Sequence, residues 1–376
     1  MNINVACATN NFGLGPVGKL SNIVSTGKNF NWFAIGNQFD TNIFENNSLK
    51  GCLWSKDEKE IEDFVTKNNI KYAVVVLDAE LVFIFMKLGV KVVFVDSLPF
   101  MWTQADIDEN LLPLNVDVYC AQKCIHLTES SKKVLAQIKN LCWVNPIGTN
   151  KKNQLIVQKS DYALINLGGL HSPFGNGEYY VDVICPTLFK ALSENNYKNV
   201  ILTCGTQANR LLRTRILNYA KENQLNAQIE TFSQNEFHEK IKNADLFLTS
   251  PGLTTIYETK DYNVKTILLP PQNLSQFYNI KFGKQLLKYV KAVDFGTKEL
   301  SDEGINQIVD LGESKCVEII YDRINNLNNE EYKSKLYTDF YLTISKEFEE
   351  NANQVFMESN GAEEILHVLE NLSKEN

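Results

Sequence analysis

The sequence predicts an α/β protein of two doubly wound domains that face each other, with a helical C-terminal tail. The chain has 376 residues, which is more than one hydrophobic core usually organises. Short apolar runs alternate with segments of helical spacing, and this alternation starts again in the second half of the chain. Together these observations favour two parallel sheets, each covered by helices.

Five apolar runs in the first half are bounded by polar or glycine residues and are mostly apolar on both faces, as buried parallel strands are. They are INVACAT (3–9), NWFAIGN (31–37), YAVVVLD (72–78), VKVVFVD (90–96) and VDVYCA (116–121). Residues 56–69 and 79–89 between them have helical spacing. The first run has no basic flank, so we expect a strand rather than a signal peptide, and a cytoplasmic protein.

The second half repeats this pattern of strands and helices. Its runs are YALINLGG (162–169), NVILTCG (199–205), AQIETF (227–232), ADLFLTS (244–250) and VKTILLPP (264–271). A polar cluster with Pro146 and Gly148 interrupts the apolar pattern and predicts the joint between the domains. The predicted boundaries are 1–147, 148–326 and 327–376, the last being a tail with apolar residues at helical spacing.

Composition excludes several classes of protein. No apolar run is long enough to cross a bilayer, so no transmembrane segment is expected. The formal net charge is -8 and the Lys and Arg residues are scattered, whereas nucleic-acid binding needs clustered basic side chains. The eight cysteines contain no CxxC pair, so we expect free core thiols and no metal site.

A glycine-rich loop follows the first strand, in NNFGLGPVGKLSN (residues 10–22), and it fits two phosphate-binding patterns. As a Walker A loop, Gly13 to Lys19 lacks the Ser or Thr that should follow the lysine, because Leu20 stands there. As a dinucleotide loop it begins late after its strand, although Asp40 lies where a ribose-binding acid is expected. A third interpretation is that the glycines only let the strand turn into its helix. The GxGxxG glycines are Gly13, Gly15 and Gly18.

Glycine turns after two strands of the second half favour a diphosphate site. Where the first of these strands ends, backbone without large side chains lets a phosphate approach closely. In ADLFLTSPGLTTIYET (244–259), a glycine stands between a strand and a helix whose free N–H groups and dipole favour an anion. An acid one turn into that helix suits ribose hydroxyls. The residues of these segments are Gly168, Gly169, Leu170, Gly252, Thr254, Thr255 and Glu258.

A loop rich in carboxamides follows the next strand, in LLPPQNLSQFYN (268–279). Carboxamides both donate and accept hydrogen bonds, which suits sugar hydroxyls. Gln272, Asn273 and Gln276 are therefore the candidate sugar contacts. Each of these segments also has a purely structural interpretation, as a helix cap or a turn, and their order and spacing together favour a binding site.

Residues 233–279 resemble the donor half of GT-B glycosyltransferases, nearest in kind to the N-acetylglucosaminyltransferase family that forms lipid II. The resemblance implies that Gly252, Thr254 and Thr255 contact the diphosphate, that Glu258 binds ribose and that Gln272 and Gln276 contact the donor sugar. It also places Phe232 and Ser233 beside the base. The chain departs from the family at Pro251 and at Ser275.

Two stretches of the first half, GLGPVGKLSNIV (13–24) and VFVDSLPFMW (93–102), resemble cytosylglucuronate synthase and its relatives. This narrower resemblance implies a UDP-glucuronate donor and a pyrimidine acceptor such as cytosine. Since strand ends of paired open sheets face a shared crevice, the loop from Gly13 to Lys19 is expected to approach the donor from the acceptor side. Lys19 also suits the carboxylate of a uronic acid.

The expected catalytic base for inverting transfer is Asp96, which ends a buried strand. Phe100 and Trp102 are expected to stack the planar ring of the acceptor. The alternative for Asp96 is that it caps the following turn. His171 and Asp78 are rival catalytic candidates, and a phosphate contact is the favoured role of His171.

No cofactor and no metal are expected beyond the UDP-sugar. A helix dipole and backbone donors suit the charge of the diphosphate. The only DxD-like run, at Asp106 and Asp108, lies in a polar helical stretch. The expected partners are the UDP-sugar and a small acceptor, and a second copy of the chain in a homodimer is a further candidate. Two other functions also remain open at this point. One is an NAD(P)-dependent oxidoreductase, and the other is a nucleotide-sugar binding protein without turnover.

Overall fold

The computed structural model describes residues 3–10, 15–38, 44, 48–148, 160–170, 177–205 and 208–374. Its contacts divide the chain into two compact units. Unit 1 is Met1–Lys151 together with Met357–Asn376, and unit 2 is Lys152–Phe356. The division differs from the predicted one because residues from 327 onward form no separate tail: they are shared between the two units.

Unit 1 is built on a parallel sheet whose strand order is β3-β2-β1-β4-β5-β6-β7 among the described residues. The strands are β1 (Ile3–Thr9), β2 (Phe30–Ile35), β3 (Leu49–Leu53), β4 (Tyr72–Val76), β5 (Lys91–Asp96), β6 (Val118–Gln122) and β7 (Leu141–Val144). The helices are α1 (Gly15–Thr26), α2 (Glu58–Lys67), α3 (Ala79–Lys87), α4 (Gln104–Asp108), α5 (Glu129–Leu135) and α14 (Gly361–Lys374). All five strands predicted in the first half are confirmed, and β3 and β7 are additional.

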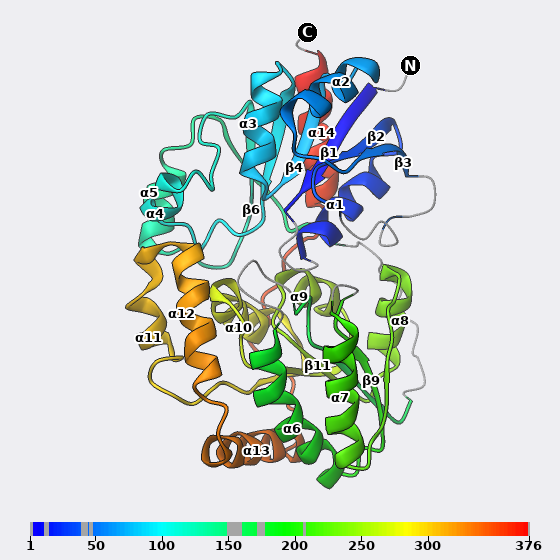
Figure 1. Ribbon diagram of the computed structural model, residues 1–376, viewed down its shortest axis with the longest axis vertical. Helices are drawn as coiled ribbons and strands as arrows, with labels where there is room; N and C mark the ends of the chain where they lie inside the picture. The colour runs from blue at the N-terminus through cyan, green and yellow to red at the C-terminus, as the bar shows by residue number, and fades with distance from the viewer. Residues whose placement is uncertain are drawn as a thin grey trace. The chain divides into compact units, whose positions relative to one another are not determined.

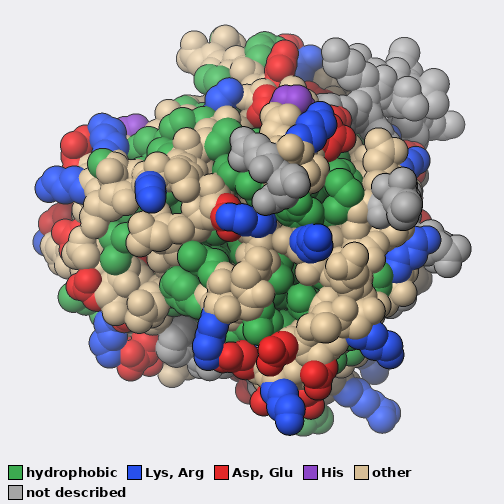
Figure 2. Space-filling view, turned by 90° about the horizontal axis from the view of Figure 1, so that it is seen from above, with side chains coloured by type: hydrophobic (Ala, Val, Ile, Leu, Met, Phe, Trp, Pro, Cys, Tyr) green, Lys and Arg blue, Asp and Glu red, His purple; other side chains and the backbone are tan. Residues whose placement is uncertain are grey.

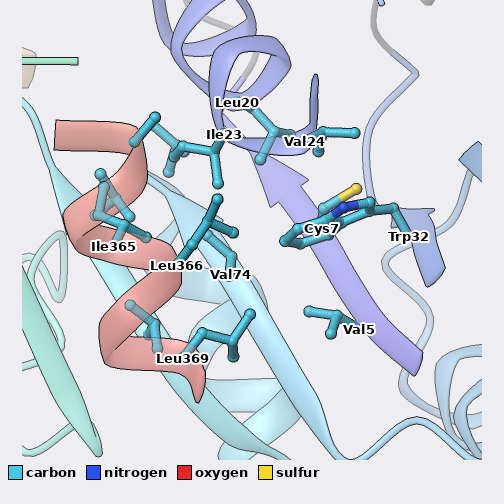
Figure 3. Packing of buried hydrophobic residues seen from close by; sticks show 14 of the residues in the cluster. Val5, Cys7, Leu20, Ile23, Val24, Trp32, Val74, Ile365, Leu366 and Leu369 are labelled. Atoms are coloured by element: carbon cyan, nitrogen blue, oxygen red, sulfur yellow. The ribbon is translucent and has the colours of Figure 1, made fainter. Parts of the chain in front are cut away.

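The core of unit 1 is closed by the last helix of the chain. Ile365 and Leu369 of α14 have no exposed surface, and they belong to the same apolar cluster as Val74 of β4 and Ile23 of α1. Figure 3 shows the side chains of α14 and α1 packed together over the central strands. The predicted amphipathic tail helix is therefore a structural part of the N-terminal sheet domain.

Unit 2 has a second parallel sheet, of which Figure 1 labels β9 and β11. Its strand order among the described residues is β10-β9-β8-β11-β12-β13. Its strands are β8 (Tyr162–Asn166), β9 (Asn199–Thr203), β10 (Asn226–Ile229), β11 (Leu246–Thr249), β12 (Lys265–Leu268) and β13 (Val290–Ala292). Its helices are α6 (Glu178–Glu194), α7 (Arg210–Glu222), α8 (Gln234–Asn243), α9 (Leu253–Thr259), α10 (Leu274–Leu286), α11 (Asp302–Asn306), η2 (Val309–Leu311), α12 (Glu313–Asn325) and α13 (Glu330–Ser345). The other predicted tail helix, α13, packs on α6.

Short polar side chains start several of these helices, as N-caps do. Asp57 accepts a hydrogen bond from the backbone N–H of Glu60 at 3.0 Å and so begins α2. Asn209 and Asn273 begin α7 and α10 in the same way. These caps fix where each helix starts relative to the strand before it, and hence where the loops at the strand ends lie.

Two of the composition-based expectations concern features that the structure describes. All eight cysteines are free thiols, as predicted, but the prediction of core positions is wrong for three of them: Cys52 is exposed, and Cys124 and Cys142 are partly exposed. None of the described helices combines the length and apolar character needed to span a bilayer. Basic and acidic side chains are interspersed on the face drawn in Figure 2, where the described residues form no broad basic area.

Candidate functional site

The loops that the sequence singles out in unit 2 meet at one place in its sheet. The chain fills one side of the sheet with β9 and β10 and the other with β12 and β13, so the order reverses between β8 and β11. These two strands pair directly, with Asn166 beside Thr249 at their carboxyl ends. Open parallel sheets bind ligands outside the carboxyl ends of the strands at such a reversal. The turns after β8 and β11 both start there.

The turn after β8 is held by a side chain of the strand itself. Asn166 Oδ1 accepts a hydrogen bond from Gly168 N at 3.0 Å, and Asn166 Nδ2 donates to Thr249 Oγ1 at 3.1 Å. Gly168 has φ of +73°, a left-handed conformation that favours glycine. Leu170 also has a positive φ, of 48°. The predicted contact His171 lies outside the described residues.

The turn after β11 brings bare backbone to the same edge. Gly252 is the N-cap of α9 and provides no side chain to cap the first N–H groups of the helix. A Cβ at Gly252 would meet nothing closer than Thr255 Oγ1 at 3.7 Å, so the fold leaves space there. Thr254 is buried, whereas Thr255 is partly exposed. The sequence-predicted diphosphate residues are thus together at one turn.

Gln272 joins the loops that follow β8, β11 and β12. Its Nε2 donates to the carbonyl oxygen of Leu167 at 2.7 Å and to Ser250 Oγ at 2.6 Å. The residue is only 6% exposed. Both N–H bonds of this carboxamide are therefore used within the protein. In this structure Gln272 connects the three loops, whereas the sequence predicted a sugar contact.

The other predicted sugar contacts form a small network of their own. Gln276 Oε1 accepts a hydrogen bond from Gln272 N at 2.9 Å, and Asn273 Oδ1 accepts one from Gln276 N at 3.3 Å. Ser275, the departure from the family pattern, also donates to Asn273 Oδ1 at 3.0 Å. These bonds fix the loop, and they leave the amide nitrogens of Asn273 and Gln276 without a hydrogen bond to the described residues.

The predicted ribose acid, Glu258, is in contact with two side chains of α8. Its Oε1 accepts a hydrogen bond from Gln234 Nε2 at 2.8 Å, and His238 Nε2 lies 3.4 Å from the same oxygen. The predicted base contacts are next to this helix. Ser233 caps α8 through a capping box with Glu236, and Phe232 stacks on Phe237 with ring centroids 6.3 Å apart. The capping box gives Ser233 a structural role. The ring of Phe232 is partly exposed, and Lys240 Nζ lies over it, 5.6 Å from the centroid.

In unit 1, the order of the sheet reverses between β1 and β4, and the glycine-rich loop follows β1. Gly13 lies outside the described residues, while Gly15 and Gly18 are in the first turns of α1. Lys19 is only 2% exposed, and its Nζ donates to Gln122 Oε1 at 3.0 Å. In this structure Lys19 is therefore an interior side chain, whereas the sequence predicted a ligand contact.

Asp96 is fully buried at the end of β5 and is surrounded by donors. Its Oδ1 accepts from Leu98 N at 2.8 Å, and its Oδ2 accepts from Trp102 Nε1 at 2.9 Å and from Tyr119 OH at 2.8 Å. Burial raises the pKa of Asp96 from 3.8 to about 6, and these three hydrogen bonds oppose that rise. The contact with Leu98 N is the turn cap that we kept as the alternative to a catalytic base.

The predicted stacking residues and the rival base are also interior. Phe100 has no exposed surface and Trp102 is 4% exposed, so neither ring presents a face to solvent in this structure. Asp78 is the N-cap of α3, accepting from Leu81 N at 3.3 Å, and its other oxygen lies 3.1 Å from Lys56 Nζ. The geometry thus favours structural roles for Asp78 and Asp96.

No protein-family model and no curated protein matches this chain. Solved structures of low identity match it over nearly its whole length. The UDP-GlcNAc 2-epimerase of Methanocaldococcus jannaschii, in complex with UDP-GlcNAc and UDP, is 16% identical, with TM-score 0.55 over 99% of this chain and 100% of that chain. The S. aureus MnaA–UDP structure is 13% identical, with TM-score 0.55 over 99% and 97%. MurG of Acinetobacter baumannii is 12% identical, with TM-score 0.49 over 98% and 99%.

At these identities the likeness concerns the fold. Together with the two parallel sheets, the match to two structures with TM-score 0.55 confirms the predicted fold class, the GT-B fold of two Rossmann-like units with a C-terminal helix. The predicted GT-B resemblance is confirmed at that level. The narrower resemblance to cytosylglucuronate synthase stays a prediction.

Sequence reasoning missed the side chains that support the site. Asn166, Thr249 and Ser250 end the two central strands of unit 2, and each makes a hydrogen bond there. A signal for them existed, because polar residues that end otherwise apolar strands are the ones that face the reversal of the sheet. His238 had no such signal, because its helical spacing is the same as that of a core residue.

Proposed function

We propose that this protein is a glycosyltransferase that uses a UDP-sugar and binds the nucleotide at the reversal point of the unit 2 sheet. The observation that carries the proposal is the convergence of the turns after β8 and β11, two strands that pair with each other. Gly168 lies in the first turn and Gly252 in the second, and neither has a side chain that would cover the backbone. Free N–H groups at a turn into a helix suit a diphosphate. The carboxylate of Glu258 suits ribose hydroxyls.

The epimerase structures give this proposal independent support of a limited kind. One of them is a complex with UDP-GlcNAc and UDP and another is a complex with UDP, and both share the fold of this chain. UDP is therefore a ligand in both of these structures, and UDP-GlcNAc is a ligand in one of them. The chemistry that follows binding is a separate question, which product analysis answers.

Gly252→Ala offers a sharp test of the nucleotide site. The added Cβ would lie 3.7 Å from its nearest neighbour, and φ of −71° is ordinary for alanine, so the fold should tolerate the change. A methyl group at the place of phosphate approach should lower the affinity for UDP by roughly tenfold or more. Titration calorimetry with UDP, UMP, ADP and NAD measures this. Binding of NAD without binding of UDP would favour the oxidoreductase instead.

Epimerisation of a UDP-sugar is the second candidate, because the fold neighbours above TM-score 0.5 include UDP-GlcNAc 2-epimerases. The two functions differ in whether an acceptor is needed. A transferase leaves the configuration at C2 of the sugar unchanged and releases UDP when an acceptor is present. Proton NMR of UDP-GlcNAc incubated with the protein alone distinguishes them, since an epimerase produces a second UDP-sugar without any acceptor.

The finer form of the proposal is inverting transfer of glucuronic acid to a pyrimidine such as cytosine, with Asp96 as general base. It is supported by the sequence resemblance of residues 13–24 and 93–102. Mass spectrometry after incubation with UDP-glucuronate and a panel of pyrimidines tests it. Turnover that persists in Asp96→Asn would remove Asp96 from the mechanism. A protein that binds UDP-sugars and never releases UDP across the panel would be a binding protein without turnover.

A further inference from the structure

Two side chains of α8 point at the same oxygen of Glu258. Gln234 and His238 are four residues apart, so they lie on one face of the helix. Gln234 Nε2 donates to Glu258 Oε1 at 2.8 Å, and His238 Nε2 lies 3.4 Å from that oxygen. His238 is 3% exposed and Glu258 8%. Helix α8 therefore contacts the buried carboxylate of Glu258, a residue of α9, at one of its two oxygens.

The second oxygen of Glu258, Oε2, has no hydrogen bond to the described residues. Within the part of the chain that the structure describes, both contacts of the carboxylate fall on Oε1. His238 Nε2 is a fully buried atom without a hydrogen bond to the described residues, whereas Glu258 Oε2 is not such an atom. The carboxylate thus has one oxygen anchored in the interior and one that reaches the surface.

The imidazole of His238 is itself fixed in place. The ring of Tyr262 packs against it nearly edge to face, with centroids 6.1 Å apart and planes at 68°. A separation of 3.4 Å is long for an N–H···O hydrogen bond, so a small shift of Glu258 toward His238 would complete it. His238 is therefore a buried donor aimed at a carboxylate that α9 carries.

We infer that His238 is a positioning residue that presents Glu258 to the ribose hydroxyls of the bound nucleotide. The inference rests on the proposed function. A carboxylate that is already ordered loses less side-chain freedom when it binds a ligand, and the saving per side chain corresponds to roughly a threefold to tenfold gain in affinity. The gain should appear only for ligands that have the ribose hydroxyls.

The test compares UDP with 2′,3′-dideoxy-UDP, which keeps the base and the diphosphate and lacks both hydroxyls. The ratio of the two affinities is measured by calorimetry for wild type, His238→Leu and His238→Gln. We expect His238→Leu to lower the ratio by roughly threefold to tenfold while the affinity for the dideoxy nucleotide stays within about twofold. His238→Gln keeps an N–H donor and should restore most of the ratio.

Glu239→Gln is the matched control, because Glu239 is adjacent on α8 and its side chain is exposed. An unchanged ratio in His238→Leu would overturn the inference, and so would equal losses for both nucleotides, which indicate a purely structural role. Circular dichroism and thermal unfolding verify that each variant is folded, and His238→Phe, which also lacks a donor, replaces His238→Leu if that variant is unstable. Wild-type protein that binds neither nucleotide refutes the proposed function itself.

Discussion

Asp96 illustrates how burial of a single residue determines its chemistry. The carboxyl has no exposed surface, and its pKa is raised from 3.8 to about 6 because burial disfavours the charged form. At neutral pH the group is mostly ionised all the same, with three donors around it. Ionised Asp96 therefore costs stability, by about 3 kcal/mol relative to its protonated form.

This cost predicts a pH-dependent effect of Asp96→Asn. The native state binds its proton more tightly than the unfolded state, so the stabilisation is present below pH 3.8 and is lost as the pH rises through about 6. From pH 4 to pH 7, the free energy of unfolding of wild type should fall by about 2 kcal/mol relative to the variant. Urea unfolding at several pH values measures it. Exposed Asp108→Asn is the control, and parallel curves for Asp96→Asn would contradict the prediction.

Gly361 is a residue whose substitution should be costly for steric reasons. A Cβ there would lie 1.9 Å from the backbone oxygen of Asn145, which cannot move independently of its strand. We expect Gly361→Ala to lower the free energy of unfolding by about 2–4 kcal/mol, since overpacking shifts backbone. Gly89→Ala, where nothing lies within 4 Å and only a positive φ of 73° is strained, should cost about 1 kcal/mol. Equal losses in the two variants would show that the close approach is unimportant.

At the residue scale, sequence predicts backbone features of the site better than side-chain roles. Gly168 and Gly252 lie in the predicted turns after β8 and β11. The positive φ of Gly168 is a local backbone requirement that favours glycine, whereas Gly252 has φ of −71°, which other residues adopt. Lys19, Phe100 and Trp102 look like ligand contacts in the sequence and are buried in the structure. Whether a side chain points inward or outward depends on neighbours far along the chain, and a single sequence does not contain that information.

At the scale of elements, the strands missed by sequence reasoning share one property. β3, β7 and β13 are all edge strands of their sheets. An edge strand is covered less completely than a central one. β3 alternates between partly exposed and exposed residues, β13 has three residues, and β7 is apolar but only four residues long. Interior strands are apolar on both faces, so the sequence shows them as continuous apolar runs.

The closing helix α14 provides the prediction at this scale. Leu369 has no exposed surface and packs in the cluster that contains Val5 and Val74. Leu369→Ala should lower the free energy of unfolding of unit 1 by about 2–5 kcal/mol, because a buried cavity replaces the side chain. Chemical denaturation followed by hydrogen exchange assigns the loss to unit 1. Leu342→Ala, at a residue 44% exposed on α13, is the control, and a comparable loss there would argue against the specific role of α14.

At the scale of the whole molecule, the two units are not consecutive segments of chain. Unit 1 needs Met357–Asn376 to complete its core, so the chain leaves it, builds unit 2 and returns. Sequence reasoning predicted the helices of the tail but placed them in a segment of their own. The apolar face of a helix says that it packs on something, and only the fold says on which sheet it packs.

The arrangement of charge in the molecule leads to the last prediction, that turnover of a UDP-sugar needs no divalent metal. The candidate diphosphate site contributes backbone N–H groups, hydroxyls and carboxamides, whereas metals that bridge a diphosphate are held by carboxylates. The acidic run that resembled a DxD motif has another use, since Asp106 Oδ2 accepts from Thr103 N and Oγ1 at 2.8 Å each and so begins α4. No group of three or more His, Cys, Asp or Glu among the described residues is arranged to hold a metal ion.

The measurement is the rate of UDP release with EDTA and with added magnesium or manganese. The rates should agree within about twofold, because a preorganised set of N–H donors can stabilise the charge of the leaving UDP without a cation. Asp106→Asn is a useful companion variant: it should lower stability through the weakened cap and leave the response to EDTA unchanged. Loss of activity in EDTA that manganese or magnesium restores would mean that a metal takes part. In that case the carboxylate of Glu258, as the buried acid beside the site, is the first ligand to test by Glu258→Gln.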